Sequence, residues 1–165
     1  MNIFLLDYDP HKLSQSLCDQ HLGKQILELA QLLSTVVHLR GGNVRGLYKP
    51  THANHPCTKW ILECEDAWDW LDDLALYLDC EYAYRFEKNH ASYRVVERAL
   101  NRLPRGNRRF PARWCIGWNT ERFPSHGNED PVQAYRRYYR HKRDEWRARG
   151  KEMTWTLRDM PAWLL

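Results

Sequence analysis

Four side chains with complementary chemistry fall close together near the start of the chain: Asp19, His21, Lys24 and Glu28. His21, Lys24 and Glu28 are spaced i, i+3 and i+7, so on an α-helix they share one face with a fixed mutual geometry. The group offers two carboxylates, an imidazole that titrates near neutral pH and a cation that can bind phosphate. A solvated helix face can carry the same residues. We take the four as candidate catalytic residues.

A second set of titratable residues lies in a loop bounded by Pro50 and Pro56, where His52 and His55 follow Lys49. Loops on rigid scaffolds often carry binding residues, and these side chains could meet a phosphate or a displaced base. The alternative is that Asn54 and the histidines cap the helix that follows. We interpret His52 and His55 as nucleic-acid or phosphate ligands.

A third cluster, Arg85, Lys88 and His90, closes the longest helical pattern, and we assign it the same phosphate-binding role.

Metal binding is not predicted, although Cys18 and His21 have ligand-like spacing, because no zinc-finger spacing is present. The chain has no glycine-rich phosphate loop, and we expect no cofactor. Its five cysteines form no CxxC pair, which is typical of reduced thiols in a cytoplasmic protein.

The charge distribution indicates the partner. Residues 1–99 contain 10 Lys/Arg and 14 Asp/Glu, whereas residues 100–165 contain 15 Lys/Arg and 7 Asp/Glu. The basic part interleaves arginines with Trp and Tyr, a composition suited to phosphates and unpaired bases. We therefore predict DNA as the partner, and no membrane. The arginines assigned to DNA binding are Arg105, Arg108, Arg109, Arg136, Arg137 and Arg140.

Hydrophobic periodicity predicts an all-α, mainly helical fold, with 1–165 as a single compact domain and a short extended N-terminal segment. Helices are expected over about 12–39, 58–86, 92–103 and 130–149, and a loop with short turns over 104–129. In the first of these helices the apolar stripe consists of Leu22, Ile26, Leu29, Leu33 and Val36. Its polar face carries the candidate catalytic residues, and Gly23 marks a possible close approach of another part of the chain.

The stretch Asp19-Gln20-His21-Leu22, followed by Glu28, resembles the phage-type pyrimidine-dimer DNA glycosylase/AP lyase family. The resemblance implies a small all-helical fold in which the glutamate assists sugar ring opening and Schiff-base chemistry. It makes Glu28 the catalytic carboxylate and His21 a residue of the site. The nucleophile in that family is the α-amine of the processed N-terminus. The longer pattern around Cys18, 50–60 and 81–85 is also similar to a group of small phage-encoded proteins.

Two positions differ from the family's pattern: Leu27 stands where the family has an arginine, and Asn2 favours retention of Met1. These differences keep two alternatives open. One is a DNA hypermodification transferase that joins a small amine or amino acid to an activated hydroxymethyl pyrimidine. Clustered cations would then suit a departing pyrophosphate. The other is a non-catalytic DNA-binding or host-interaction protein, which would bind in a salt-sensitive way and leave the DNA unchanged.

Overall fold

The computed structural model describes residues 2–103, 111, 114–115, 117 and 129–165. These residues form six α-helices and a final 3-10 turn and include no β-strand, which confirms the all-α fold class. The elements are α1 (Pro10–Ser16), α2 (Asp19–Leu39), α3 (Pro56–Glu63), α4 (Ala67–Phe86), α5 (Tyr93–Leu100), α6 (Pro131–Arg147) and η1 (Ala162–Leu164). None of the helices in the described part of the chain is long and apolar enough to cross a membrane.

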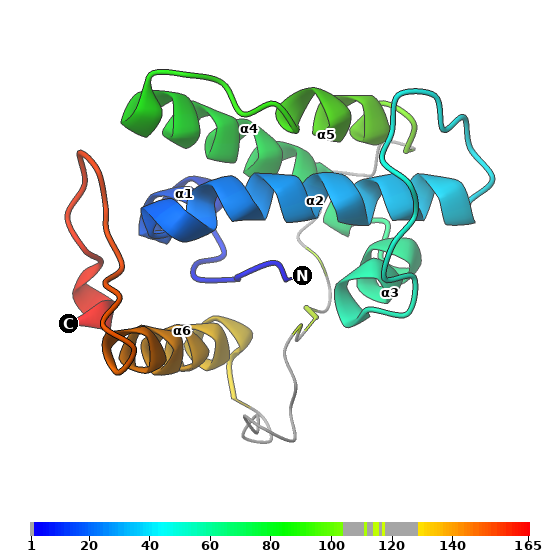
Figure 1. Ribbon diagram of the computed structural model, residues 1–165. Coiled ribbons are helices and arrows are strands. Elements are labelled where there is room, and N and C mark those ends of the chain that lie inside the picture. The colour runs from blue at the N-terminus through cyan, green and yellow to red at the C-terminus, as the bar shows by residue number, and fades with distance from the viewer. Residues whose placement is uncertain (1, 104–110, 112–113, 116, 118–128) are drawn as a thin grey trace.

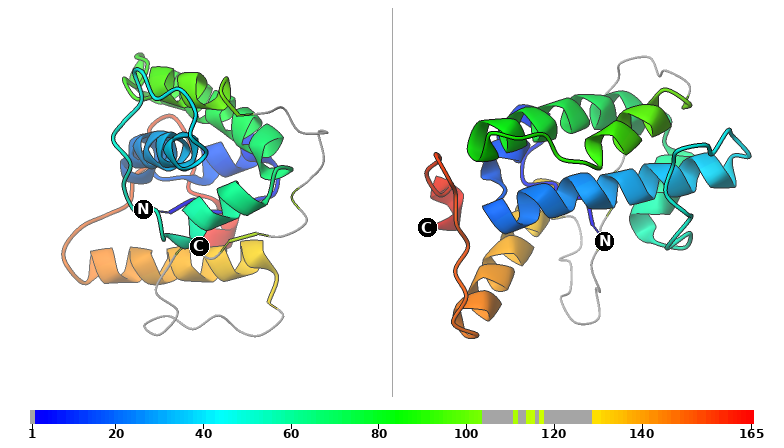
Figure 2. Two further views of the ribbon diagram at one scale, coloured as in Figure 1. Left: turned by 90° about the vertical axis from the view of Figure 1, so that its right-hand side faces the viewer. Right: turned by 45° about the horizontal axis from the view of Figure 1, so that its top comes forward.

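Helix α2 lies at the centre of the molecule. In Figure 1, α4 and α5 lie on one side of α2 and α6 lies on the other, and the views in Figure 2 agree. The extended segment 2–8 runs between α2 and α6, and residues 2–6 are buried there. The predicted apolar stripe of α2, from Leu22 to Val36, is buried throughout. Gly23 approaches α4 closely, because a Cβ there would lie 3.1 Å from the Tyr82 ring.

The helix expected over 12–39 is instead two helices, broken at Leu17 and Cys18, which have extended backbones. Tertiary contacts compensate the break. The Leu17 and Gln15 carbonyls accept hydrogen bonds from Arg85, and the Cys18 amide donates to the Tyr139 hydroxyl at 3.0 Å. These partners are distant in sequence, so local periodicity could not reveal that the chain turns here.

The helix expected over 58–86 is also two helices, separated by residues 64–66. The indole of Trp68 donates to the Ile61 carbonyl at 2.8 Å, so one backbone acceptor near the end of α3 is satisfied across the break. The helices expected at 92–103 and 130–149 are present but shorter, as α5 and α6.

A buried ion network joins four parts of the fold. The Arg85 side chain is fully buried and contacts Glu81 at 2.7 Å and Asp19 at 3.2 Å. Arg158 from the C-terminal segment contacts the second oxygen of Glu81 at 2.9 Å. The guanidinium is therefore the point where the end of α1, the start of α2, α4 and the C-terminal segment are held together.

We predict that Arg85→Lys lowers the free energy of unfolding by about 2–3 kcal/mol, because one ammonium cannot replace a planar group that serves four acceptors. Urea unfolding monitored by circular dichroism measures the change. The matched control is Lys88→Ala, at an exposed cation nearby, which should change stability by no more than about 0.5 kcal/mol. Equal stabilities for the two variants would contradict the role given to Arg85.

Candidate active site

The backbone of the N-terminal segment is bound by side chains of α2 instead of by a neighbouring strand. The Gln25 side-chain oxygen accepts from the Phe4 amide at 3.2 Å, and its nitrogen donates to the Asn2 carbonyl at 2.9 Å. Gln25 is buried, so it satisfies backbone groups that water cannot reach. These two bonds hold residues 2–4 along the polar face of α2, one turn before Glu28.

Glu28 contacts the nitrogen of the second residue. Its Oε2 accepts a hydrogen bond from the Asn2 backbone nitrogen at 2.7 Å, and both residues are 7% exposed. The Lys24 ammonium lies 3.7 Å from the other carboxylate oxygen, while the Lys24 side chain stays 61% exposed. The carboxylate is thus enclosed beside the start of the chain, and a solvent-facing cation lies next to it.

The Asn2 side chain is held from the opposite side. The Tyr135 hydroxyl of α6 donates to Asn2 Oδ1 at 3.0 Å, and Cys57 Sγ lies 3.9 Å from the same oxygen. Gly117 packs so closely that an added Cβ would lie 2.2 Å from Asn2 Oδ1. With both backbone and side chain bonded, residue 2 has a single orientation, and its nitrogen faces Glu28.

His21 lies on the same face of α2 and contacts α6. Its Nδ1 lies 2.8 Å from the Tyr139 hydroxyl and 3.3 Å from Cys18 Sγ, and its ring packs against Phe4 and Trp146. Burial, together with the positive charges of Lys142 and Lys24, lowers the pKa of His21 to about 3. The imidazole is therefore neutral at physiological pH, and at least two cations lie near it.

Asp19 begins the same helix but engages a different part of the molecule. Its carboxylate accepts from the Thr156 amide and hydroxyl and pairs with Arg85. Burial raises the pKa of Asp19, but the bonds from Thr156 and Arg85 outweigh this effect, so the pKa lies below its usual value. The structure groups His21, Lys24 and Glu28, and it directs Asp19 and the buried Arg85 into the ion network.

The histidine loop has mixed roles. His55 caps α3, because its Nδ1 accepts from the Cys57 amide at 3.2 Å, as the capping alternative predicted for this residue. His52 is exposed, has a positive φ of 52°, and contacts the Thr51 hydroxyl at 2.6 Å. Through Cys57 the end of this loop comes near Asn2, and its earlier part lies against α2, where Thr51 bonds Thr35.

Lys88 and His90 lie beyond the end of α4. Lys88 is exposed, whereas His90 Nδ1 accepts from the Ser92 amide at 3.2 Å and its ring lies against Tyr82. Burial lowers the pKa of His90 below its usual value, against the opposing effect of Asp79. His90 also lies within 4 Å of the position a Gly23 Cβ would take, so it borders a different face of α2 from that of His21.

Helix α6 carries three of the arginines assigned to DNA, and all three also make internal bonds. Arg136 donates to the Leu6 carbonyl and pairs with Asp7. Arg137 pairs with Glu129, and Arg140 donates to the Trp163 carbonyl. The bonds of Arg136 and Arg140 attach α6 to the N- and C-terminal segments. Arg105, Arg108 and Arg109 lie outside the described residues.

Within the described part of the chain, no group of three or more His, Cys, Asp or Glu side chains could hold a metal ion.

The site combines an enclosed carboxylate, the second backbone nitrogen of the chain and neighbouring cations. A protein-family model described as pyrimidine dimer DNA glycosylase matches residues 1–93, which include all of these groups except those of α6. The chain belongs to this family. The family's description supports a DNA glycosylase-like function at the level of the family. Comparison with curated proteins and with solved structures gives no match.

Four residues of the site were not among the predicted ones: Asn2, Gln25, Tyr135 and Tyr139. Gln25 follows His21 by four positions and precedes Glu28 by three, so the helical spacing alone could have included it. The two tyrosines lie far along the chain from α2, about a hundred residues after its end, and both are buried in α6. No local pattern distinguishes them from ordinary core aromatics.

The neutral state of His21 predicts a pH dependence of stability. The unfolded chain protonates His21 below pH 6.5, whereas the folded protein does so only near pH 3, so the unfolded state binds more protons between these values. Stability from this residue is therefore lost as pH falls, by about 2 kcal/mol between pH 6.5 and 4.5.

Urea unfolding of the native protein and of His21→Gln at both pH values measures this contribution, since effects of other groups are common to the two proteins. The native protein should lose about 2 kcal/mol more than the variant on acidification. Parallel losses would show that His21 titrates normally in the folded state.

Proposed function

We propose that this chain is a DNA glycosylase in which the nitrogen of residue 2 is the nucleophile and Glu28 is the catalytic carboxylate. The observation that carries the proposal is the 2.7 Å hydrogen bond between that nitrogen and Glu28 Oε2. An amine and an enclosed carboxylate in contact are what Schiff-base chemistry on a sugar requires. The match of the family model over residues 1–93 independently supports the class of reaction.

The reaction requires a free amine. In a chain that starts at Asn2, the nitrogen lone pair attacks C1′ of the target nucleotide, the glycosidic bond between C1′ and the base breaks, and the base takes a proton from solvent. Glu28 then passes the proton taken from the amine to O4′ as the C1′–O4′ bond opens, which gives an iminium between residue 2 and C1′. Loss of a C2′ proton and departure of the 3′ phosphate would cut the strand. Glu28 accepts the proton of the attacking amine and stabilises the iminium charge.

Two residues on the face of α2 that carries Glu28 have roles that follow from their environments. The exposed ammonium of Lys24 can bind a phosphate of the target strand while it stays next to the carboxylate. Neutral His21 adds no repulsive charge near the cationic intermediate, and its tyrosine contact fixes the ring. Target bases in duplex DNA are stacked, so the nucleotide must be displaced to reach this enclosed site.

Removal of Met1 is a condition of the proposal, because the nitrogen of residue 2 is an amide while Met1 is attached. Asn2 favours retention of Met1 during synthesis. Removal of Met1 would therefore control whether the protein is active.

The test compares a chain that begins at Asn2, released from a cleavable fusion, with the chain that begins at Met1. Both are incubated with borohydride and an oligonucleotide that contains an abasic site, and covalent complexes are counted. Only the chain that begins at Asn2 should form a complex with its α-amine. In that chain, Glu28→Gln should slow complex formation by at least about 100-fold, the scale of a lost general base. The matched control, Glu97→Gln at an exposed carboxylate of α5, should not.

A UV-irradiated oligonucleotide tests glycosidic-bond cleavage, and a second oligonucleotide with an activated hydroxymethyl pyrimidine is incubated with the protein and a small amine. Mass spectrometry of the nucleosides from both separates the three candidate functions. Glycosidic cleavage within a pyrimidine dimer supports the proposal. An added mass on a modified pyrimidine would replace it with the transferase, and binding without any change would replace it with a non-catalytic protein. A complex that forms through a lysine would assign the nucleophile elsewhere.

A further inference from the structure

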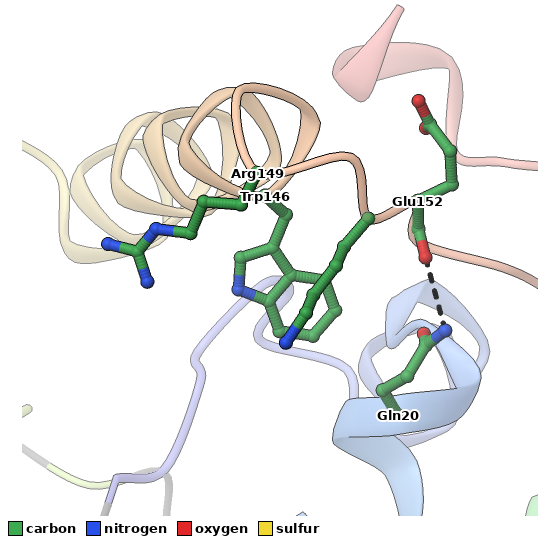
Figure 3. Close-up of a pocket in the computed structure, with 5 residues that line it drawn as sticks. Gln20, Trp146, Arg149 and Glu152 are labelled. Carbon is green, nitrogen blue, oxygen red and sulfur yellow. Dashed lines mark hydrogen bonds between the residues drawn. The ribbon is translucent and has the colours of Figure 1, made fainter.

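A pocket of about 440 Å³ opens where the end of α6 meets the start of α2. Its lining residues are Gln20, Trp146, Arg149, Lys151 and Glu152. Figure 3 shows Trp146 and Arg149 extending from the end of α6 and Gln20 from α2. The volume is within the range of roughly 300–1,000 Å³ found for small-molecule sites. The pocket is separate from Glu28 and lies largely outside the part of the chain that matches the family.

The end of α6 builds the aromatic and cationic parts of this pocket together. Gly150 has a φ of 67°, and the Lys151 amide donates to the Trp146 carbonyl at 2.9 Å. This pattern is the glycine-dependent reversal with which many helices end. It turns the chain back over the last helical turn, so that Arg149 and Lys151 border the indole of Trp146.

The remaining wall is already bonded within the protein. The Gln20 side chain donates to the Glu152 carbonyl at 3.2 Å, drawn as a dashed line in Figure 3, and accepts from the Thr154 amide at 3.3 Å. The Glu152 carboxylate pairs with Arg147 at 3.3 Å. Among the residues that the structure describes, neither Arg149 nor Lys151 has a carboxylate at ion-pair distance. The pocket thus offers a fixed frame and two cations available to a ligand.

The pocket is linked to the candidate active site through one ring contact. The Trp146 and His21 ring centroids lie 5.0 Å apart. His21 and Glu28 are seven residues apart on α2, which corresponds to about 10 Å along the helix axis. A DNA strand that presents a sugar at Glu28 would therefore carry its next nucleotides past Trp146.

We propose that this pocket binds an unpaired nucleotide of the DNA strand, with its base stacked on Trp146 and its phosphates on Arg149 and Lys151. An aromatic face accepts any base, and clustered cations follow the backbone, which is how single strands are bound without sequence readout. The proposal rests on the proposed function for DNA as the ligand. It adds a second contact that positions the strand beside the reacting sugar.

The test measures DNA binding in the Glu28→Gln background, so that no reaction occurs during the measurement. Fluorescence anisotropy gives the Kd for a duplex with one unpaired 2-aminopurine nucleotide and for the same duplex fully paired. The duplex with the unpaired nucleotide should bind more tightly than the fully paired duplex. Adding Trp146→Ala should weaken its binding by about 5- to 150-fold, the fold-change that 1–3 kcal/mol of base stacking produces. Binding of the paired duplex should change by less than twofold, and Trp146→Phe should retain most of the preference.

The cations are tested separately, which keeps the proposal falsifiable if Trp146→Ala fails to fold. Arg149→Ala with Lys151→Ala should weaken binding of the unpaired duplex more than Lys59→Ala with Arg94→Ala, a pair of exposed cations on α3 and α5. Equal effects of the two double variants would contradict the proposed role of the pocket in binding DNA. Equal losses for paired and unpaired DNA after Trp146→Ala would also contradict it. So would a free deoxynucleoside monophosphate that binds as tightly as the duplex with the unpaired nucleotide and does so through Trp146.

The two proposals fail in different ways. Covalent trapping at residue 2 without a Trp146-dependent preference would contradict the binding role of the pocket and support the glycosylase function. A Trp146-dependent preference without trapping would keep the pocket as a DNA-binding site and remove the proposed chemistry.

Discussion

The hydrogen bond between Glu28 and the nitrogen of Asn2 is the constraint around which the rest of the structure is arranged. Burying a carboxylate is costly unless its oxygens have partners, and burying the start of a chain is costly unless its backbone groups are bonded. Each group here satisfies the other. The segment 2–8 can therefore lie between α2 and α6, and α6 bonds to it through Arg136.

This arrangement also sets the electrostatics of the site. Because the N-terminal segment and α6 cover the start of α2, His21 is excluded from water, and it stays neutral beside Lys24 and Lys142. Asp19, two residues before His21, is neutralised by Arg85 in a separate buried network. The negative charge of Asp19 is therefore paired with Arg85 and not with the cations near Glu28. The result is an enclosed carboxylate with positive charge around it, an environment suited to a polyanion that must place one sugar at one point.

The sequence allowed the fold class, the apolar stripe of α2 and the grouping of His21, Lys24 and Glu28 to be predicted, since all of these depend on helical spacing. It did not allow the breaks at Leu17 and Cys18 to be predicted, because these are stabilised by Arg85 and Tyr139, far along the chain. For Arg85, the sequence shows a cation near a helix end, and only the packing shows that its guanidinium is buried. The same is true of Asn2, whose importance depends on where the chain begins relative to α2.

The most direct measurement is a crystal structure of the chain that begins at Asn2, trapped by borohydride on DNA that contains an abasic site. The account predicts a covalent bond between the nitrogen of Asn2 and C1′ of the sugar, with the Glu28 carboxylate in hydrogen-bonding contact with that nitrogen. DNA bound on another face, or a sugar attached to a lysine while Glu28 remains covered, would contradict it.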